Sequence, residues 1–164
     1  MKTEASLRLI LMRHAKSAWD DPSLRDHDRR LNERGRLAAA LMGAWLRDAG
    51  LTPDFALVSS AARTQETWAL MGLEAPMETR PALYEADAAT ILSVIRGAPG
   101  GGTLMILGHQ PGMQDAANRL LSDEMIAEYP TAKAAVIGFD AAGWAGVGFS
   151  AGRLIAAQAP KALV

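Results

Sequence analysis

The 164-residue sequence contains no cysteine, so the chain has no disulfides, no thiolate metal ligands and no cysteine nucleophile. It also lacks any apolar run close to the ~20 residues that a transmembrane helix needs. Neither sign of charge dominates, because 17 Lys and Arg residues stand against 18 Asp and Glu residues, for a net charge of −1. The sequence therefore provides no general basic field for binding nucleic acid or an anionic membrane.

The N-terminal region also lacks the features of a secretory leader. Arg13 and His14 interrupt the first apolar run, and the residues before that run contain no long apolar segment. The remaining composition is ordinary, with 49% hydrophobic and 21% charged residues, which is enough apolar material for a sizeable core. We therefore expect a soluble cytoplasmic protein with a single domain over residues 1–164.

Short apolar runs alternate along the chain with amphipathic stretches. The apolar runs predict strands at 7–12, 55–58, 103–107, 134–139, 145–149 and 153–158. The amphipathic stretches predict helices at 32–49, 61–71, 88–96 and 113–121. This alternation predicts an α/β fold, a three-layer α/β/α sandwich whose mainly parallel sheet has a mixed edge.

The helix expected at 32–49 carries the clearest local signals. Asn32 is a suitable N-cap, and Gly50 is a natural stop directly after the helix. Leu37, Leu41 and Trp45 recur every fourth residue, which predicts an apolar stripe along one side of the helix.

Cationic and imidazole side chains follow three of the predicted strands. Arg13 and His14 come directly after the first strand, Arg63 lies just beyond the second, and His109 follows the third. Because parallel strands have their carboxyl ends at the same edge of a sheet, we expect these side chains to meet there. Guanidinium groups keep their charge and donate several hydrogen bonds to phosphate oxygens, so the sequence predicts a phosphate site.

Each of these residues has an ordinary explanation when it is considered alone. A single histidine at a strand end is usually structural, and Arg63 could lie on the exposed face of a helix. Arg13 is harder to explain in this way, because a charge at the edge of a core needs a partner. Four such residues at three strand ends together favour a binding site.

Four motifs, in this order, resemble those of the histidine phosphatase superfamily. Leu9–Lys16 (LILMRHAK) resembles the segment in which Arg-His follows the first strand, and Arg29–Gly35 (RRLNERG) resembles the segment that opens the first helix. Ser59–Thr67 (SSAARTQET) resembles the block with the second arginine, and Gly108–Pro111 (GHQP) resembles the block with the second histidine. The resemblance covers residues 7–112.

Two positions depart from the usual form of these motifs. Ala15 stands where many members have Gly, which is common in the short SixA-type branch, and Arg30 replaces the usual Pro. The first departure points to the SixA-type phosphohistidine phosphatases, and the second adds a charge near the mouth of the site.

The resemblance implies a phosphoglycerate mutase-like fold and a phosphatase that uses no cofactor and no metal ion. It makes His14 the nucleophile, which becomes transiently phosphorylated. It makes Arg13, Arg63 and His109 the groups that bind the phosphoryl oxygens and stabilise the charge of the transition state.

Other residues are candidates for supporting roles. Leu83–Glu85 resembles the segment that carries the proton donor in mutase-like members, so Glu85 is the candidate general acid; alternatively it is a solvated glutamate near a helix start. Lys16 and Ser17 follow the nucleophile, and Arg29 belongs to the second motif. We therefore expect these three to contact phosphate or substrate.

The loop expected at residues 20–30 contains several carboxylates around His27. Asp and His side chains can ligate metals, but such ligands need a firm scaffold. We therefore expect a solvated loop at the rim of the pocket, with Trp19 beside it, rather than a metal site. Trp45 fits the core better.

The segment between Arg63 and His109 is short, and two helices with their connections fill it. This leaves little room for the cap that mutase-type and sugar-phosphatase members carry. An open pocket suits a phosphorylated protein, so the expected function is that of a phosphohistidine phosphatase acting on a phosphohistidine carrier. The alternatives are a phosphomonoesterase for a small metabolite ester at the same site, a phosphoglycerate mutase and a non-catalytic phosphate-binding module. The sequence does not indicate an oligomeric state.

Overall fold

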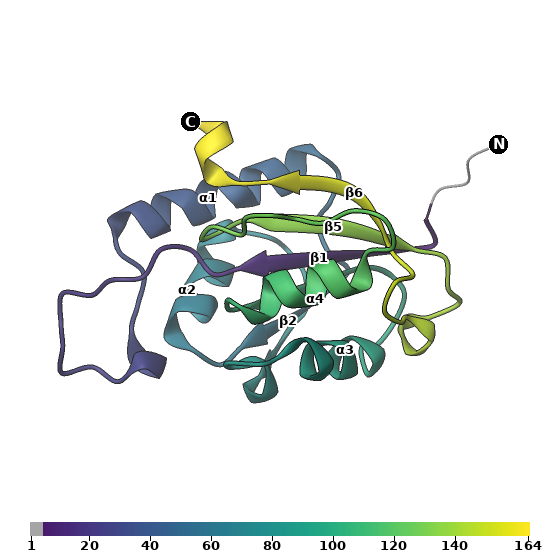
Figure 1. Cartoon of the computed structure of the whole chain (residues 1–164). Coiled ribbons are helices and arrows are strands. Elements are labelled where there is room, and N and C mark those ends of the chain that lie inside the picture. Colours follow the sequence, from purple (N-terminus) through teal and green to yellow (C-terminus); the bar gives the residue numbers. More distant parts are fainter. Residues whose placement is uncertain (1–4) are drawn as a thin grey trace.

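The computed structural model describes residues 5–164, which form a six-stranded sheet with helices on both faces (Figure 1). Residues 1–4, at the start of the region considered above as a leader, lie outside the described part. The strands are β1 (Leu7–Arg13), β2 (Phe55–Ser59), β3 (Met77–Arg80), β4 (Gly102–Gly108), β5 (Ala134–Phe139) and β6 (Arg153–Gln158). The α-helices are α1 (Glu33–Asp48), α2 (Ala62–Met71), α3 (Ala88–Arg96) and α4 (Gly112–Leu120). Short 3-10 helices are η1 (Asp26–Asp28), η2 (Pro81–Leu83), η3 (Trp144–Gly146) and η4 (Pro160–Leu163).

The strand order in the sheet is β3-β2-β4-β1-β5-β6. The first four strands of this order pair in parallel, whereas β5 is antiparallel to β1 and β6 is antiparallel to β5. The predicted three-layer sandwich with a mixed edge is therefore confirmed. In the register, Arg13 lies opposite Gly108 and Val58 lies opposite Leu107, so β1, β2 and β4 end side by side.

Side chains of β1 alternate between the two faces of the sheet. Leu9 and Leu11 pack into the core under α3 and α4, whereas Ile10 and Met12 pack into the core under α1 and α2. All four are fully buried. Burial on both faces explains why β1 is an almost continuous apolar run and why it could be predicted.

One predicted strand does not form, and one strand was not predicted. No strand forms at 145–149, where η3 and a turn bury Trp144 and Val147 against the core instead. Gly146 and Gly148 weaken strand formation there. Strand β3 was not predicted, because its sequence METR is mostly polar and two of its four residues are exposed at the edge of the sheet.

Helix α1 has the predicted ends but a different buried face. The Asn32 side chain accepts a hydrogen bond from the backbone of the first turn, and Gly50 adopts a φ of 71° after the last turn. Leu37, however, is 63% exposed, and Leu41 is exposed as well. The buried side combines the large side chains of Met42 and Leu46 with small residues. A Cβ at Gly43 would lie 2.0 Å from the Met71 carbonyl oxygen of α2, so the close approach of α1 and α2 requires glycine at this position.

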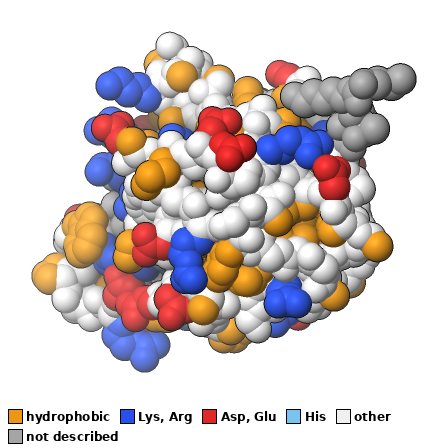
Figure 2. Space-filling view, turned by 45° about the vertical axis from the view of Figure 1, so that its right-hand side comes forward, with side chains coloured by type: hydrophobic (Ala, Val, Ile, Leu, Met, Phe, Trp, Pro, Cys, Tyr) orange, Lys and Arg blue, Asp and Glu red, His pale blue; other side chains and the backbone are white. Residues whose placement is uncertain are grey.

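The surface shows no region of a single charge on the face in Figure 2, where acidic and basic side chains are interspersed and hydrophobic side chains form small patches between them. Within residues 5–164, none of the helices has both the length and the apolar character that crossing a membrane requires.

Candidate functional site

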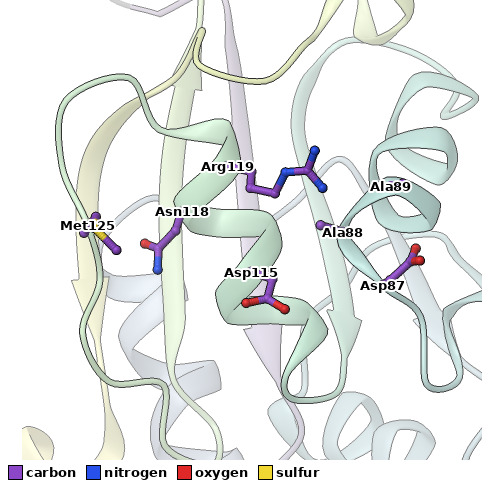
Figure 3. A pocket seen from close by; sticks show the side chains of 7 residues that line it. All are labelled: Asp87, Ala88, Ala89, Asp115, Asn118, Arg119 and Met125. Carbon is purple, nitrogen blue, oxygen red and sulfur yellow. The ribbon is translucent and has the colours of Figure 1, made fainter.

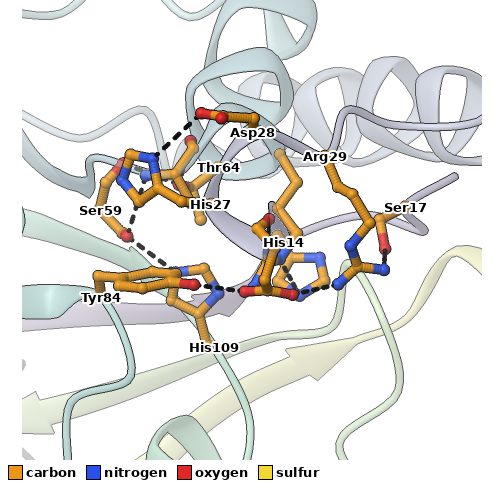
Figure 4. Close-up of polar contacts among 12 residues, drawn as sticks. His14, Ser17, His27, Asp28, Arg29, Ser59, Thr64, Tyr84 and His109 are labelled. Atoms are coloured by element: carbon orange, nitrogen blue, oxygen red, sulfur yellow. Dashed lines mark hydrogen bonds and ion pairs between the residues drawn. The ribbon is translucent and has the colours of Figure 1, made fainter. Parts of the chain in front are cut away.

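Side chains that follow β1, β2 and β4 come together at the carboxyl edge of the sheet (Figure 4). His14, Arg63 and His109 are all more than nine-tenths buried. The Arg63 Nε–H donates to His14 Nε2 at 3.3 Å, and the ring centroids of His14 and His109 are 5.3 Å apart. Residues that are 95 positions apart in the sequence thus form one cluster, as parallel strand ends predict.

The backbone around His14 is fixed by neighbours from several elements. Its amide donates to the Gly108 carbonyl at the end of β4, and its carbonyl accepts from the Ala132 amide. The next amide, that of Ala15, donates to the Thr67 hydroxyl on α2 at 3.1 Å. These bonds hold the first residue after β1 in a defined orientation toward the cluster.

The hydrogen bond to a carbonyl determines the tautomer of the His14 ring. His14 Nδ1 lies 2.6 Å from the Ala15 carbonyl oxygen, which can only accept, so Nδ1 carries the hydrogen. Nε2 then presents its lone pair, and the Arg63 Nε–H points to it. The ring is held as a neutral imidazole, and its unprotonated nitrogen, Nε2, accepts a hydrogen bond from the guanidinium group.

The surroundings of His14 also favour the neutral ring. Burial is the largest influence on its pKa, and the bond to Ala15 acts in the opposite direction. The positive charges of Arg63, Arg13 and Arg29 lower the pKa further, so that it falls to about 4. At neutral pH the imidazole is therefore an uncharged ring next to positive charge.

His109 lies in a similar environment. Its Nε2 is 2.8 Å from the Ser59 hydroxyl at the end of β2. Burial, followed by the proximity of His14 and Arg63, lowers its pKa to about 3. His109 is therefore a neutral ring that can donate or accept a hydrogen bond without adding charge.

Two buried nitrogen atoms at this edge lack a hydrogen-bond partner among the described residues. They are Arg13 Nε and His109 Nδ1. The other end of the Arg13 guanidinium donates to the Tyr129 carbonyl at 3.0 Å. A buried donor without a partner costs about 1–3 kcal/mol, and such a cost is typical of a site where a ligand supplies the acceptor.

Arg29 and Ser17 lie next to this cluster, whereas Lys16 lies outside it. The Arg29 guanidinium stacks on Trp19 at 3.4 Å from the ring centroid and reaches the Ser17 hydroxyl at 3.5 Å. Arg29 and Ser17 are buried, and Lys16 and Trp19 are exposed. A surface hollow beside the cluster is lined by Lys16, Ser17, Ala18, Trp19, Asp20, Leu31, Asn32, Glu33 and Arg36.

Asp26 and Tyr84 also belong to the cluster, although the sequence analysis did not single them out. The Asp26 carboxylate accepts a hydrogen bond from Arg63 Nη2 at 3.0 Å and further bonds from Arg29 Nη2 and the Tyr84 hydroxyl. The Tyr84 ring meets the His109 ring edge-on, with centroids 5.5 Å apart. The position of Tyr84 directly before Glu85 was the only available signal for either residue.

Glu85, the candidate general acid, makes no hydrogen bond or ion pair to this cluster among the described residues. It is exposed and adopts a positive φ of 55° after η2. Its neighbour Tyr84 reaches the site instead.

The carboxylates of the loop at 20–30 pair with side chains of that loop and its neighbours. Asp21 accepts from Ser23, and Asp28 pairs with Arg25. Asp26 pairs with Arg29, and His27 contacts the Ser60 hydroxyl at 2.9 Å. Across residues 5–164, no three His, Asp or Glu side chains are grouped so that they could hold a metal ion.

A second surface hollow lies between the start of α3 and the outer side of α4 (Figure 3). It is lined by Asp87, Ala88, Ala89, Asp115, Asn118, Arg119 and Met125. No imidazole lines it, and its one guanidinium belongs to Arg119, which stacks on Phe149. The two buried imidazoles, His14 and His109, and Arg63 lie in the cluster at the carboxyl edge of the sheet instead.

The sequence matches a known family. Residues 9–92 match the sequence model of the histidine phosphatase superfamily (branch 1). An uncharacterized protein of Mycobacterium tuberculosis (strain ATCC 25618 / H37Rv) is 36% identical over 160 residues, which cover 92% of this chain and 100% of that protein. An uncharacterized chloroplastic protein of Arabidopsis thaliana is 38% identical over 132 residues, which cover 72% of this chain but only 61% of that longer protein.

The fold matches a solved structure over nearly its whole length. A proposed phosphohistidine phosphatase SixA from Nakamurella multipartitia superimposes with a TM-score of 0.86 at 28% sequence identity. The match covers 96% of this chain and 99% of that chain.

We expect the His14 ring to stay uncharged as the pH is lowered from 8 to about 5.5, because its pKa is about 4. An ordinary histidine would be mostly protonated below pH 6.5. The measurement is a ¹⁵N NMR titration of the imidazole nitrogens, with the His14→Ala variant used to assign the signal. Protonation of His14 near pH 6.5 would contradict the described environment.

The same shift has a consequence for stability. Because the pKa of His14 is lower in the folded chain than in the unfolded chain, the unfolded chain binds more protons between pH 6.5 and 4. The contribution of His14 to the free energy of unfolding therefore falls as the pH is lowered through this range.

Proposed function

The chain belongs to the histidine phosphatase superfamily (branch 1), and from this premise we propose that it hydrolyses phosphohistidine on protein substrates through a covalent intermediate on His14. The observation that supports this most is the neutral His14 ring, whose Nε2 lone pair faces the Arg63 guanidinium. An uncharged imidazole nitrogen that carries no hydrogen is the form that attacks phosphorus, and the Nε2 lone pair becomes available when a phosphoryl oxygen takes the Arg63 Nε–H in its place.

Two transfers complete the proposed reaction. In the first, the His14 Nε2 lone pair forms a bond to phosphorus while the P–N bond to the substrate imidazole breaks, and the leaving ring takes a proton from solvent. In the second, water attacks the phosphorus on His14 and the new P–N bond breaks. One proton of that water returns to solvent, and hydrogen phosphate leaves with a neutral His14 restored. Each transfer passes through a state with charge spread over the phosphoryl oxygens.

The surrounding residues match that charge. Arg63 and Arg13 supply positive charge, and the unpartnered Arg13 Nε and His109 Nδ1 can donate to or contact phosphoryl oxygens. Two guanidinium groups can supply the charge that Mg²⁺ supplies in other phosphoryl-transfer enzymes, so the proposal includes no metal ion. Arg29, whose Nη2 shares the Asp26 carboxylate with Arg63, would add a further donor to the phosphoryl oxygens, and Ser17 would contact the substrate beside it.

A protein substrate fits the shape of the site. The surface hollow at Lys16, Ser17 and Trp19 lies beside the cluster, although His14, Arg63 and His109 do not line it, and η2 and α3 occupy the short segment between β3 and β4. The match to the SixA structure from Nakamurella supports the same substrate class. A phosphohistidine presented by another protein needs no enclosure, whereas a small ester must be held by the site alone.

We expect the wild-type protein to release phosphate from a phosphohistidine-bearing protein domain, and His14→Ala to be slower by at least about 10³-fold, because it removes the nucleophile. Phosphate release is measured for this domain and, in parallel, for a panel of small phosphate esters. Met125→Ala is the control, since Met125 is exposed and lines the second hollow between α3 and α4 rather than the His14 cluster; it should stay within about threefold of wild type. Faster turnover of an ester than of the domain would contradict the proposed substrate class, because it would make the protein a phosphatase for small esters that uses the same site.

The substrate class also predicts the effect of Glu85. An imidazole leaves more readily than an alkoxide, so a phosphohistidine needs less help from a proton donor. We expect Glu85→Gln to change kcat on the phosphohistidine domain by less than about threefold, whereas a general acid typically contributes about 10²-fold or more. The measurement is kcat for the variant on the domain and on an ester. A loss of about 100-fold on the domain would make Glu85 the acid and contradict this part of the proposal.

A further inference from the structure

The carboxylate of Asp26 lies across the two arginines at the mouth of the site. Its Oδ2 accepts from Arg63 Nη2 at 3.0 Å and from the Tyr84 hydroxyl, and its Oδ1 accepts from Arg29 Nη2. The Asp26 side chain is 43% exposed, whereas those of Arg63 and Arg29 are 7% and 9% exposed. One carboxylate thus takes hydrogen bonds from two nearly buried guanidinium groups.

These donors are also the ones that a phosphoryl group at His14 would use. The Arg63 guanidinium contacts Asp26 through Nη2 and His14 through Nε, so the carboxylate and the nucleophile share a single planar group. Tyr84 donates to Asp26 through its hydroxyl, and its ring packs against the His109 ring (Figure 4). Two guanidinium groups and a hydroxyl around an anion are the arrangement that binds phosphate in proteins.

The chain holds Asp26 in this position without fixing it from all sides. Asp26 opens the single turn η1, and its own carbonyl accepts from Arg63 Nη1 at 2.8 Å. The turn belongs to the long connection between β1 and α1, and its residues are not part of the sheet (Figure 1). A rotation of the Asp26 side chain away from the arginines would therefore require no change in β1, β2 or β4.

Asp26 carries a full negative charge in this arrangement. Partial burial acts to raise its pKa, but hydrogen bonds from Tyr84, Arg29 and Arg63 outweigh that effect and hold the pKa well below the ordinary range of an aspartate. The group is thus an anion at every pH at which the protein is expected to work.

We propose that Asp26 is a specificity-determining residue, an internal anion that competes with the phosphoryl group for Arg63 and Arg29 and leaves them when that group binds. The inference rests on the proposed function, because it takes these arginines as phosphoryl ligands. A phosphoryl dianion has more charge and more acceptor oxygens than the carboxylate and displaces it. A singly charged carboxylate or chloride has no such advantage and is excluded. When inorganic phosphate leaves, Asp26 returns to the arginines.

The test compares anion binding by Asp26→Asn and by Asp28→Asn. Asp28 is the matched control, because it lies in the same turn, has the same charge and pairs with Arg25 and His27 rather than with Arg63 or Arg29. Isothermal titration calorimetry with inorganic phosphate and with tungstate gives the dissociation constants. Asp26→Asn should bind both anions at least about fivefold more tightly than wild type, a coupling of ordinary size between two ligands of one site. Asp28→Asn should stay within about twofold of wild type.

Each other outcome has a defined meaning. If wild type binds phosphate and Asp26→Asn binds it equally or more weakly, Asp26 is not a competitor and the inference is overturned while the proposed function stands. If Asp28→Asn tightened anion binding as much as Asp26→Asn, the gain in affinity would come from the loss of any negative charge in the turn, and the inference would again be overturned. If neither wild type nor Asp26→Asn binds either anion, both the inference and the proposed function fail.

A second measurement needs no variant. In a crystal structure of the wild-type protein with tungstate, the Asp26 oxygens should have left Arg63 Nη2, and the tungstate oxygens should take their place. A carboxylate still hydrogen-bonded to Arg63 Nη2 while tungstate occupies the same guanidinium group would contradict the competition.

Discussion

A guanidinium group that donates to the lone pair of a buried neutral imidazole is the interaction on which this site depends. The contact between Arg63 Nε and His14 Nε2 joins the end of β1 to the start of α2. It requires that His14 carry its hydrogen on Nδ1 and that the ring stay uncharged. The Ala15 carbonyl favours that tautomer, because it accepts a hydrogen bond from Nδ1. Burial and neighbouring positive charge together prevent protonation. The same conditions are those that the proposed phosphoryl transfer to His14 requires.

The sheet makes this contact possible. Parallel pairing of β1 with β4 and of β4 with β2 places three strand ends at one edge, and the helices that follow them begin there. The two cores on either side of the sheet hold these strands in register, so residues distant in sequence meet without help from a ligand. Positive charge gathered at such an edge needs an anion nearby, and Asp26 supplies one from the connection between β1 and α1.

The sequence was informative where a residue's position follows from regular structure. Arg13, His14, Arg63 and His109 could be predicted to meet because each follows a strand of a parallel sheet. Asp26 could not, because nothing local distinguishes it from the other aspartates in the loop. Its role depends on how the η1 turn lies over Arg63, which is a tertiary contact.

The same limit applied to packing. The leucine periodicity of α1 predicted a helix correctly but indicated the wrong buried face, because Gly43 permits a backbone approach to α2 that a leucine stripe would prevent. The polar edge strand β3 had no apolar signal at all. Local sequence patterns therefore predicted most helices and strands and the residues at the strand ends. The buried face of α1 and the position of Asp26 depend on contacts between elements, which these patterns do not contain.

The central claim is that His14 takes the phosphoryl group, and the most direct measurement traps that state. Wild-type protein mixed with a phosphohistidine-bearing domain is quenched in alkali during turnover, because phosphohistidine is unstable in acid, and its peptides are mapped by mass spectrometry. The account predicts phosphate on the His14 peptide and on no peptide of the His14→Ala variant. Phosphate on a different residue, or turnover by His14→Ala at the wild-type rate, would contradict it.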